Sequence, residues 1–208
     1  MKHIYLLFFL ILISKLTFAQ TPLPDALITE DSIPDRVPEF PGGTRSFYNY
    51  ISQNVHYSDI ANLIGITGRV VVSFVVNKEG EITRVTPVNC IGAGCEAEAV
   101  KVIEQSPDWK PGIYNGRLVN VIYNIPITFD VNDRKVTMAN LRKSNYGFVF
   151  SIKGSLYTID EAEKILGGSF MSTQIEIAVP FYNYNKISKF DTPDKKEIYL
   201  LVFKSKKD

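Results

Sequence analysis

Three segments in which apolar and polar residues alternate constrain the fold of this chain most. The first runs over residues 69–76, the second returns over 82–88 after the turn 77–80, and the third is the long segment 119–129. A helical segment, 96–105, carries its apolar residues on one side and separates the second strand from the third. Two shorter helical segments come before the strands, over 44–54 and 58–64. This order predicts an α+β fold, with an antiparallel three-stranded sheet that carries helices on one face.

The N-terminus has the pattern of a secretory signal peptide. Lys2 precedes an unbroken apolar run over residues 4–13, and Thr17 and Ala19 occupy the small-residue positions of a cleavage site. We therefore expect residues 1–19 to be removed on export. An uncleaved anchor is the alternative, but a span needs about 20 apolar residues and this run ends at Ser14. The mature chain is expected to have no transmembrane span.

The rest of the chain divides by composition. Residues 20–41 are rich in proline and acidic residues and predict an extended leader, because proline disfavours helices and central strands. The folded domain is expected over 42–130. A polar stretch over 131–145 is interpreted as a linker to a second unit, residues 146–208.

The second unit is expected to be a small α+β unit. Alternating apolar residues predict strands over 148–152, 175–179 and 198–203. Thr158 and Glu161 have the spacing of a capping box, in which each side chain bonds the other residue's backbone N–H, and predict a helix start. Phe181 to Phe190 is aromatic, and its pattern favours neither helix nor strand.

Within these elements, residues 38–129 resemble the C-terminal domain of TonB. The matching segments, in chain order, are 38–43 (PEFPGG), 65–76 (GITGRVVVSFVV), 80–85 (GEITRV), 96–103 (EAEAVKVI) and the most distinctive one, 107–112 (PDWKPG), followed by Asn115-Gly116. The second unit more weakly resembles part of the plug domain of a TonB-dependent receptor, and would then dock on a receptor or on the TonB-like edge.

The resemblance implies a function in the periplasm of the Gram-negative cell envelope, without catalysis. Domains of this family bind a short segment of a TonB-dependent outer-membrane receptor by adding it as a strand to the sheet. The implied partner site is the last strand, with a loosely matching region before the first strand; its residues are Val119, Val121, Tyr123, Ile125, Ile127, Gln53, His56 and Tyr57. A proline at Val121 is expected to block this edge. The alternative is that the second unit covers the edge.

The chain also departs from TonB. TonB has a membrane anchor and a long proline-rich spacer, whereas this leader is about twenty residues and spans about 70 Å at most. Energy transduction is therefore in doubt. The alternative function is that of a periplasmic envelope scaffold or cell-wall-binding protein that reuses the fold. The partner would then be a related envelope protein, and a homodimer is left open.

Cys90 and Cys95 are separated by Ile-Gly-Ala-Gly. In an oxidising compartment a disulfide between them is allowed, and the glycines permit the tight loop it needs. Two free thiols are the alternative. Redox catalysis is disfavoured, because the spacing is not Cys-x-x-Cys.

The remaining residues argue against an enzyme, a metal site or a cofactor. His56 is the single histidine after residue 19, so neither a zinc site nor a catalytic triad can be built around histidine pairs. The Gly92-x-Gly94 pair lacks the third glycine and the parallel-strand context of a phosphate-binding loop. Trp109 is predicted to pack in the core rather than to anchor a partner.

Charge argues against nucleic acid as a partner. The whole chain has 23 Lys+Arg and 22 Asp+Glu, a formal net charge of +1. Residues 20–134 have 9 basic and 14 acidic residues (9 − 14 = −5), and residues 135–208 have 12 and 8 (12 − 8 = +4). Neither part has the large basic excess that binds a phosphate backbone. The two parts could instead attract each other or divide two partners between them.

Overall fold

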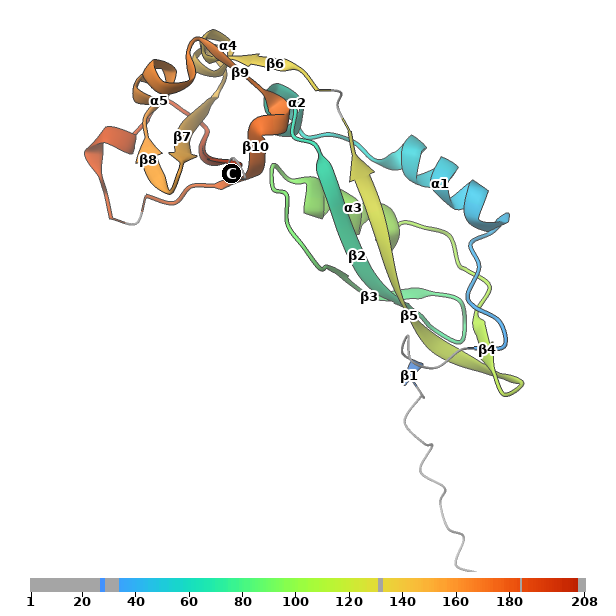
Figure 1. The fold of residues 1–208 in the computed structure, drawn as a ribbon. Coiled ribbons are helices and arrows are strands. Elements are labelled where there is room, and N and C mark those ends of the chain that lie inside the picture. Colours follow the sequence, from blue (N-terminus) through green and yellow to red (C-terminus); the bar gives the residue numbers. More distant parts are fainter. Residues whose placement is uncertain (1–26, 29–33, 131–132, 184, 206–208) are drawn as a thin grey trace, which may run out of the picture.

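The computed structural model describes residues 27–28, 34–130, 133–183 and 185–205. These residues form two units, which lie end to end in Figure 1. The predicted signal peptide, residues 1–19, lies outside the described residues, as does most of the predicted leader.

The first unit contains a mixed sheet and three helices. Its elements are β1 (Leu27–Ile28), α1 (Gly43–Asn54), α2 (Asp59–Ile64), β2 (Gly68–Val76), β3 (Ile82–Pro87), α3 (Cys95–Glu104), β4 (Gly112–Tyr114) and β5 (Arg117–Phe129). The sheet order is β1-β5-β2-β3, and β4 pairs with β5 as a hairpin. The predicted antiparallel strands β2, β3 and β5 are confirmed. The short strands β1 and β4 were not predicted.

Helices α1 and α3 cover one face of this sheet, as predicted. The Tyr50 hydroxyl of α1 donates to the Val102 carbonyl of α3 at 3.0 Å, which ties the two helices together. Between them and the sheet lies Trp109, which is 6% exposed. Its ring meets four aromatic rings at centroid distances of 5.3 to 5.7 Å: Phe40, Phe47, Phe74 and Tyr123. The prediction that Trp109 packs in the core is therefore confirmed.

Part of the predicted leader is folded. Phe40 is 6% exposed and packs on Trp109. The backbones of Arg36 and Glu39 form isolated bridges with Ile113 and Lys110 on the outer side of β4. The described residues 34–41 therefore belong to the first unit, and the domain begins earlier than residue 42.

The second unit is an α+β unit that begins inside the predicted linker. Its elements are β6 (Lys135–Thr137), α4 (Met138–Lys143), β7 (Tyr146–Ile152), β8 (Ser155–Tyr157), α5 (Ile159–Leu166), β9 (Ser169–Met171), η1 (Ser172–Gln174), β10 (Ile175–Pro180), η2 (Ser188–Phe190) and β11 (Glu197–Phe203). One sheet has the order β10-β11-β7-β8, and β6 pairs with β9. The linker prediction is corrected from residue 135 onward, because Val136, Met138 and Leu141 are buried in the core.

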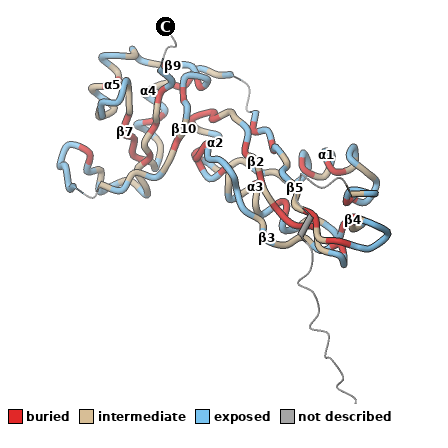
Figure 2. The backbone as a smooth tube through the Cα atoms, turned by 60° about the horizontal axis from the view of Figure 1, so that its bottom comes forward, coloured by how far each residue is buried: buried red, intermediate tan, exposed pale blue. Residues whose placement is uncertain are grey.

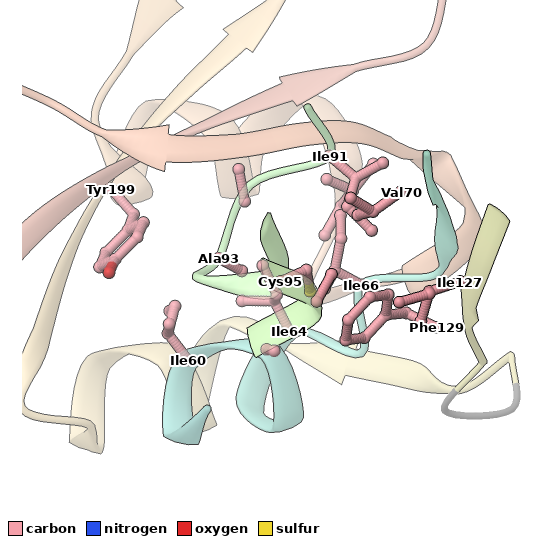
Figure 3. Packing of buried hydrophobic residues seen from close by; sticks show 14 of the residues in the cluster. Ile60, Ile64, Ile66, Val70, Ile91, Ala93, Cys95, Ile127, Phe129 and Tyr199 are labelled. Atoms are coloured by element: carbon pink, nitrogen blue, oxygen red, sulfur yellow. The ribbon is translucent and has the colours of Figure 1, made fainter. Parts of the chain in front are cut away.

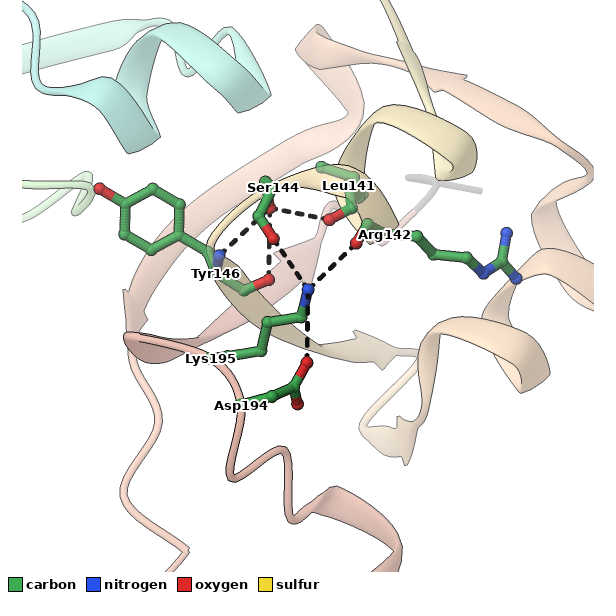
Figure 4. Close-up of polar contacts among 6 residues, drawn as sticks. All are labelled: Leu141, Arg142, Ser144, Tyr146, Asp194 and Lys195. Carbon is green, nitrogen blue, oxygen red and sulfur yellow. Dashed lines mark hydrogen bonds and ion pairs between the residues drawn. The ribbon is translucent and has the colours of Figure 1, made fainter.

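Polar contacts at both helices fix this unit. The capping box predicted at Thr158 and Glu161 is confirmed at the start of α5. At the other helix, the Lys195 ammonium donates to the carbonyls of Arg142 and Ser144, at 3.1 and 2.8 Å (Figure 4). These carbonyls lie at the end of α4, where backbone acceptors lack partners within the helix. Lys195 therefore caps the C-terminus of α4.

The two units share one hydrophobic core. The loop 91–93, between β3 and α3, lies against the edge strand β10: Ala93 N donates to Ala178 O at 2.6 Å, and Ala178 N donates to Ile91 O at 3.1 Å. Figure 3 shows Ala93 of this loop towards Ile60 of α2 and Tyr199 of β11, and Ile91 next to Val70 of β2. All five side chains belong to the same buried cluster. The second unit is therefore packed against the end of the first, at the α2 side.

Candidate functional site

The outer edge of β5, on the side away from β2, is the backbone edge predicted from the sequence to be the partner site. On one side, β5 pairs with β2 over residues 121–129 without a register shift. On the other, β1 pairs in parallel with Asn120 and Val121. Among the described residues, no strand pairs with the remainder of that outer side, 122–129. Helix α1 runs beside it (Figure 1).

The direction of the β5 backbone follows from Val71. Its N–H donates to Asn89 Oδ1 at 2.7 Å and its carbonyl accepts from Val88 N at 2.8 Å, so both its backbone groups face β3. Val71 pairs with Pro126, which must then turn its own carbonyl away from β2. Alternation directs the backbone groups of Thr128 outward as well. The odd-numbered residues of 121–129 face β2 instead.

The predicted site residues of β5 have buried or half-buried side chains. Val119, Val121 and Ile127 are 9%, 8% and 1% exposed. Tyr123 donates its hydroxyl proton to Pro38 O at 2.8 Å, and burial raises its pKa. These side chains support the strand from the core side. A partner would therefore contact the backbone edge of β5 and its even-numbered residues.

A groove of about 470 Å³ opens along this edge where the chain before α1 approaches β5. Its lining is largely aromatic and aliphatic: Val37, Pro38, Phe40, Phe47, Tyr48, Trp109, Tyr123, Ile125 and Pro126, with the polar residues Arg36, Glu39, Thr44 and Asn124. Val37 and Tyr48 are 54% and 56% exposed, so they present apolar surface to solvent at this groove. We call this the upstream groove.

A second groove, of about 340 Å³, continues along the same edge towards the end of β5. It lies between α1 and residues 126–130 and contains Ile51, Val55 and Tyr57. The Tyr57 hydroxyl accepts from Asp130 N at 2.7 Å, and its ring packs edge-on against Phe129. Burial is the main cause of the raised pKa of Tyr57. We call this the downstream groove.

The structure brings together only part of the predicted site. Tyr57 joins β5 at the downstream groove, whereas Gln53 and His56 are exposed and line neither groove. Val37, Tyr48 and Pro126 were not predicted. Pro126 carried a usable signal, because a proline within an alternating segment indicates an edge strand. The positions of Val37 and Tyr48 depend on the packing of α1 and could not be inferred.

The second unit does not cover this edge. Its β10 bonds the loop 91–93, which follows β3, and β3 lies on the opposite side of β2 from β5. In Figure 2 the second unit lies beyond α2, and α1 and β5 lie away from it. The alternative in which residues 146–208 hide the strand is therefore not what the described residues form.

Cys90 and Cys95 are free thiols in the structure. Cys90 is exposed, whereas Cys95 is 1% exposed at the start of α3. Burial, followed by the charge of Glu96, raises the pKa of Cys95 to about 12. Burial and Glu96 also raise the pKa of Cys90. Neither thiol is activated as a nucleophile, since the reactive form is the thiolate.

The described residues also bear on metal binding and on membrane crossing. They contain no group of three or more His, Cys, Asp or Glu side chains placed to hold a metal ion. They also contain no helix that is long and apolar enough to cross a membrane.

Comparison with known proteins gives a family match over part of the chain. Residues 53–131 match the model of the Gram-negative bacterial TonB protein C-terminal family, a match that includes all of β5. Two NMR solution structures of the TonB C-terminal domain of Helicobacter pylori are similar to part of the chain. One is 24% identical, with a TM-score of 0.32, and the match covers 41% of this chain and 90% of that one. The other is 25% identical, with a TM-score of 0.34 and coverages of 44% and 87%. No curated protein matches the chain significantly. The family match ends at residue 131, so the plug-like resemblance of the second unit stays a prediction.

Proposed function

Residues 53–131 form a domain of the TonB C-terminal family, and on this premise we propose that the protein binds an extended segment of a TonB-dependent outer-membrane receptor. The segment adds as a strand to the outer edge of β5, in the periplasm. Domains of this family are associated with TonB-dependent transport. The role of this protein there is to bind a protein segment, not to catalyse a reaction.

The observation that carries the proposal is the outer edge of β5 beside two grooves. Outward-facing backbone groups on an edge strand readily pair with a further chain. Strand addition uses such an edge for main-chain hydrogen bonds and uses neighbouring pockets for alternate side chains. The upstream and downstream grooves supply those pockets on the α1 side of the edge.

Thr128 is the position at which to block this edge. Its N–H points outward, so Thr128→Pro removes a donor from the edge and leaves the bonds between β5 and β2 in place. The sequence had suggested Val121 for this purpose. Because the N–H of Val121 faces β2, a proline there would break the sheet rather than block the edge.

The test uses synthetic peptides that cover the N-terminal segments of the TonB-dependent receptors of the same bacterium. Trp109 is the single tryptophan and lines the upstream groove, so its fluorescence can report binding. We expect at least one peptide to bind the wild type, Thr128→Pro to weaken it about fivefold or more, and Thr128→Val to retain it. Thr128→Val is the matched control, because it keeps the N–H and removes only the hydroxyl. Equal binding by all three proteins, or no binding by the wild type, would overturn the proposal.

A further inference from the structure

Pro126 sits on the outward-facing series of the edge that we propose as the partner site. It offers an outward carbonyl but has no N–H, so a strand added here finds an acceptor without the matching donor. Natural sheets use prolines on exposed edges to discourage indiscriminate pairing with other strands. Pro126 therefore weakens pairing through the backbone alone at this position of the edge.

The two grooves meet at Pro126. Phe47, Tyr48 and Pro126 line both of them, so these three residues form the boundary along which the upstream groove passes into the downstream groove. Phe47 is 4% exposed and forms the floor of this boundary, whereas Tyr48 is 56% exposed and forms its rim. The position where the backbone lacks a hydrogen-bond donor is thus also the position where apolar side chains line both grooves.

Successive side chains of an extended segment point to opposite sides, so only every second side chain of an added strand can face α1. Those side chains meet the apolar walls of the two grooves. The charged side chains that line the upstream groove already have partners within the chain: Glu39 Oε2 pairs with Lys110 Nζ at 3.0 Å, and the Arg36 guanidinium donates to Pro111 O at 3.1 Å. The walls therefore favour apolar side chains over charged ones.

We propose that Pro126 and Tyr48 make this edge selective for one class of partner: an extended segment with apolar side chains on its α1-facing side. Pro126 lowers the affinity of every strand to a similar degree, and the grooves restore it only for segments that fill them. This inference rests on the proposed function, because it specifies which segments the β5 edge accepts.

The experiment starts from the receptor peptide that binds the wild type most tightly. Two copies of it are made, each with one of the two alternating series of apolar residues replaced by serine. We expect one copy to bind at least about tenfold more weakly, since it empties the grooves, and the other to bind nearly as well as the parent. Pro126→Val restores the outward N–H and should tighten all three peptides by a similar factor, about fivefold. Tyr48→Ala should weaken the parent several-fold and leave the copy with empty grooves unchanged.

The outcomes separate the two proposals. If no peptide binds the wild type or either variant, the proposed function fails and this inference fails with it. If peptides bind but both serine copies bind equally, only the inference is overturned. The same holds if Pro126→Val changes no affinity, or if Tyr48→Ala weakens all three peptides alike. Both substitutions suit their sites, since valine is favoured in strands and alanine in an exposed helix position, and circular dichroism verifies folding.

Discussion

The backbone of Gly92 lies directly against the carbonyl oxygen of Ala178, and this contact joins the two units. A Cβ built on Gly92 would lie 1.8 Å from that oxygen, and the φ of Gly92 is +84°. Gly92→Ala should therefore lower the free energy of unfolding by at least about 2 kcal/mol, because it combines left-handed strain with a steric clash. Urea unfolding measures the change.

Gly154→Ala is the matched control for this substitution. Gly154 has a φ of +78°, but a Cβ there would meet nothing within 4 Å. Gly154→Ala introduces the conformational strain without the clash, so it should lower the free energy of unfolding clearly less than Gly92→Ala does. Equal losses of stability would show that the contact with Ala178 contributes nothing.

A second prediction concerns the pH dependence of α5. The Thr158 N–H donates to Glu161 Oε2 at 2.8 Å, and this bond is the main cause of the lowered pKa of Glu161. A carboxyl whose pKa is lower in the folded state stabilises the fold above its unfolded value. That stability is lost as the pH falls through 4.5, the ordinary value, and below. Glu161→Gln should therefore flatten the acidic side of the curve of melting temperature against pH.

Thr158→Ala separates the cap from the titration. It removes the hydroxyl that accepts from Glu161 N at 3.3 Å, but it retains the backbone N–H that is the main cause of the lowered pKa of Glu161. It should cost about 1 kcal/mol at every pH and keep the acidic slope. A slope that persists in Glu161→Gln would assign it to another group.

The alternating pattern predicted the first sheet well, because β2 and β5 each bury one face. Val70, Val72 and Phe74 are buried, as their spacing indicated. Local residues also define the capping box at Thr158. In both cases the structure depends on interactions within a few residues or on one buried face, which a sequence reveals directly.

The wrong predictions concern elements that fold only against residues far away in the sequence. Residues 135–143 look polar, and their three buried apolar side chains, at 136, 138 and 141, are spaced two and then three residues apart, so no single period extends over the segment. Phe40 was assigned to the leader, because its neighbours in the sequence do not indicate that it packs against Trp109. The grooves beside β5 likewise arise where α1, the segment before it and β5 converge, so no local pattern indicates them, and Pro126 indicates only that β5 is an edge strand.

A third prediction tests how α4 ends. The Lys195 ammonium bonds the carbonyls of Arg142 and Ser144, and its side chain is 20% exposed. Lys195→Met keeps the apolar stem but leaves these acceptors without their donor, so it should lower the free energy of unfolding by about 1–2 kcal/mol. Lys196→Met is the control at an exposed neighbouring lysine and should cost less than about 0.5 kcal/mol. Equal effects in urea unfolding would contradict the capping role.

The last prediction concerns the two thiols. Burial raises the pKa of Cys95 to about 12, so at pH 8 its thiolate fraction is about a thousandfold smaller than that of an ordinary cysteine. Cys90 is exposed, although burial and Glu96 raise its pKa too. In the reduced, native protein we therefore expect iodoacetamide to modify Cys90 slowly and Cys95 only after denaturation, as followed by mass spectrometry of tryptic peptides. Rapid modification of native Cys95 would contradict its burial. A protein isolated from the periplasm in which neither residue reacts until a reductant is added would instead contain the Cys90–Cys95 disulfide.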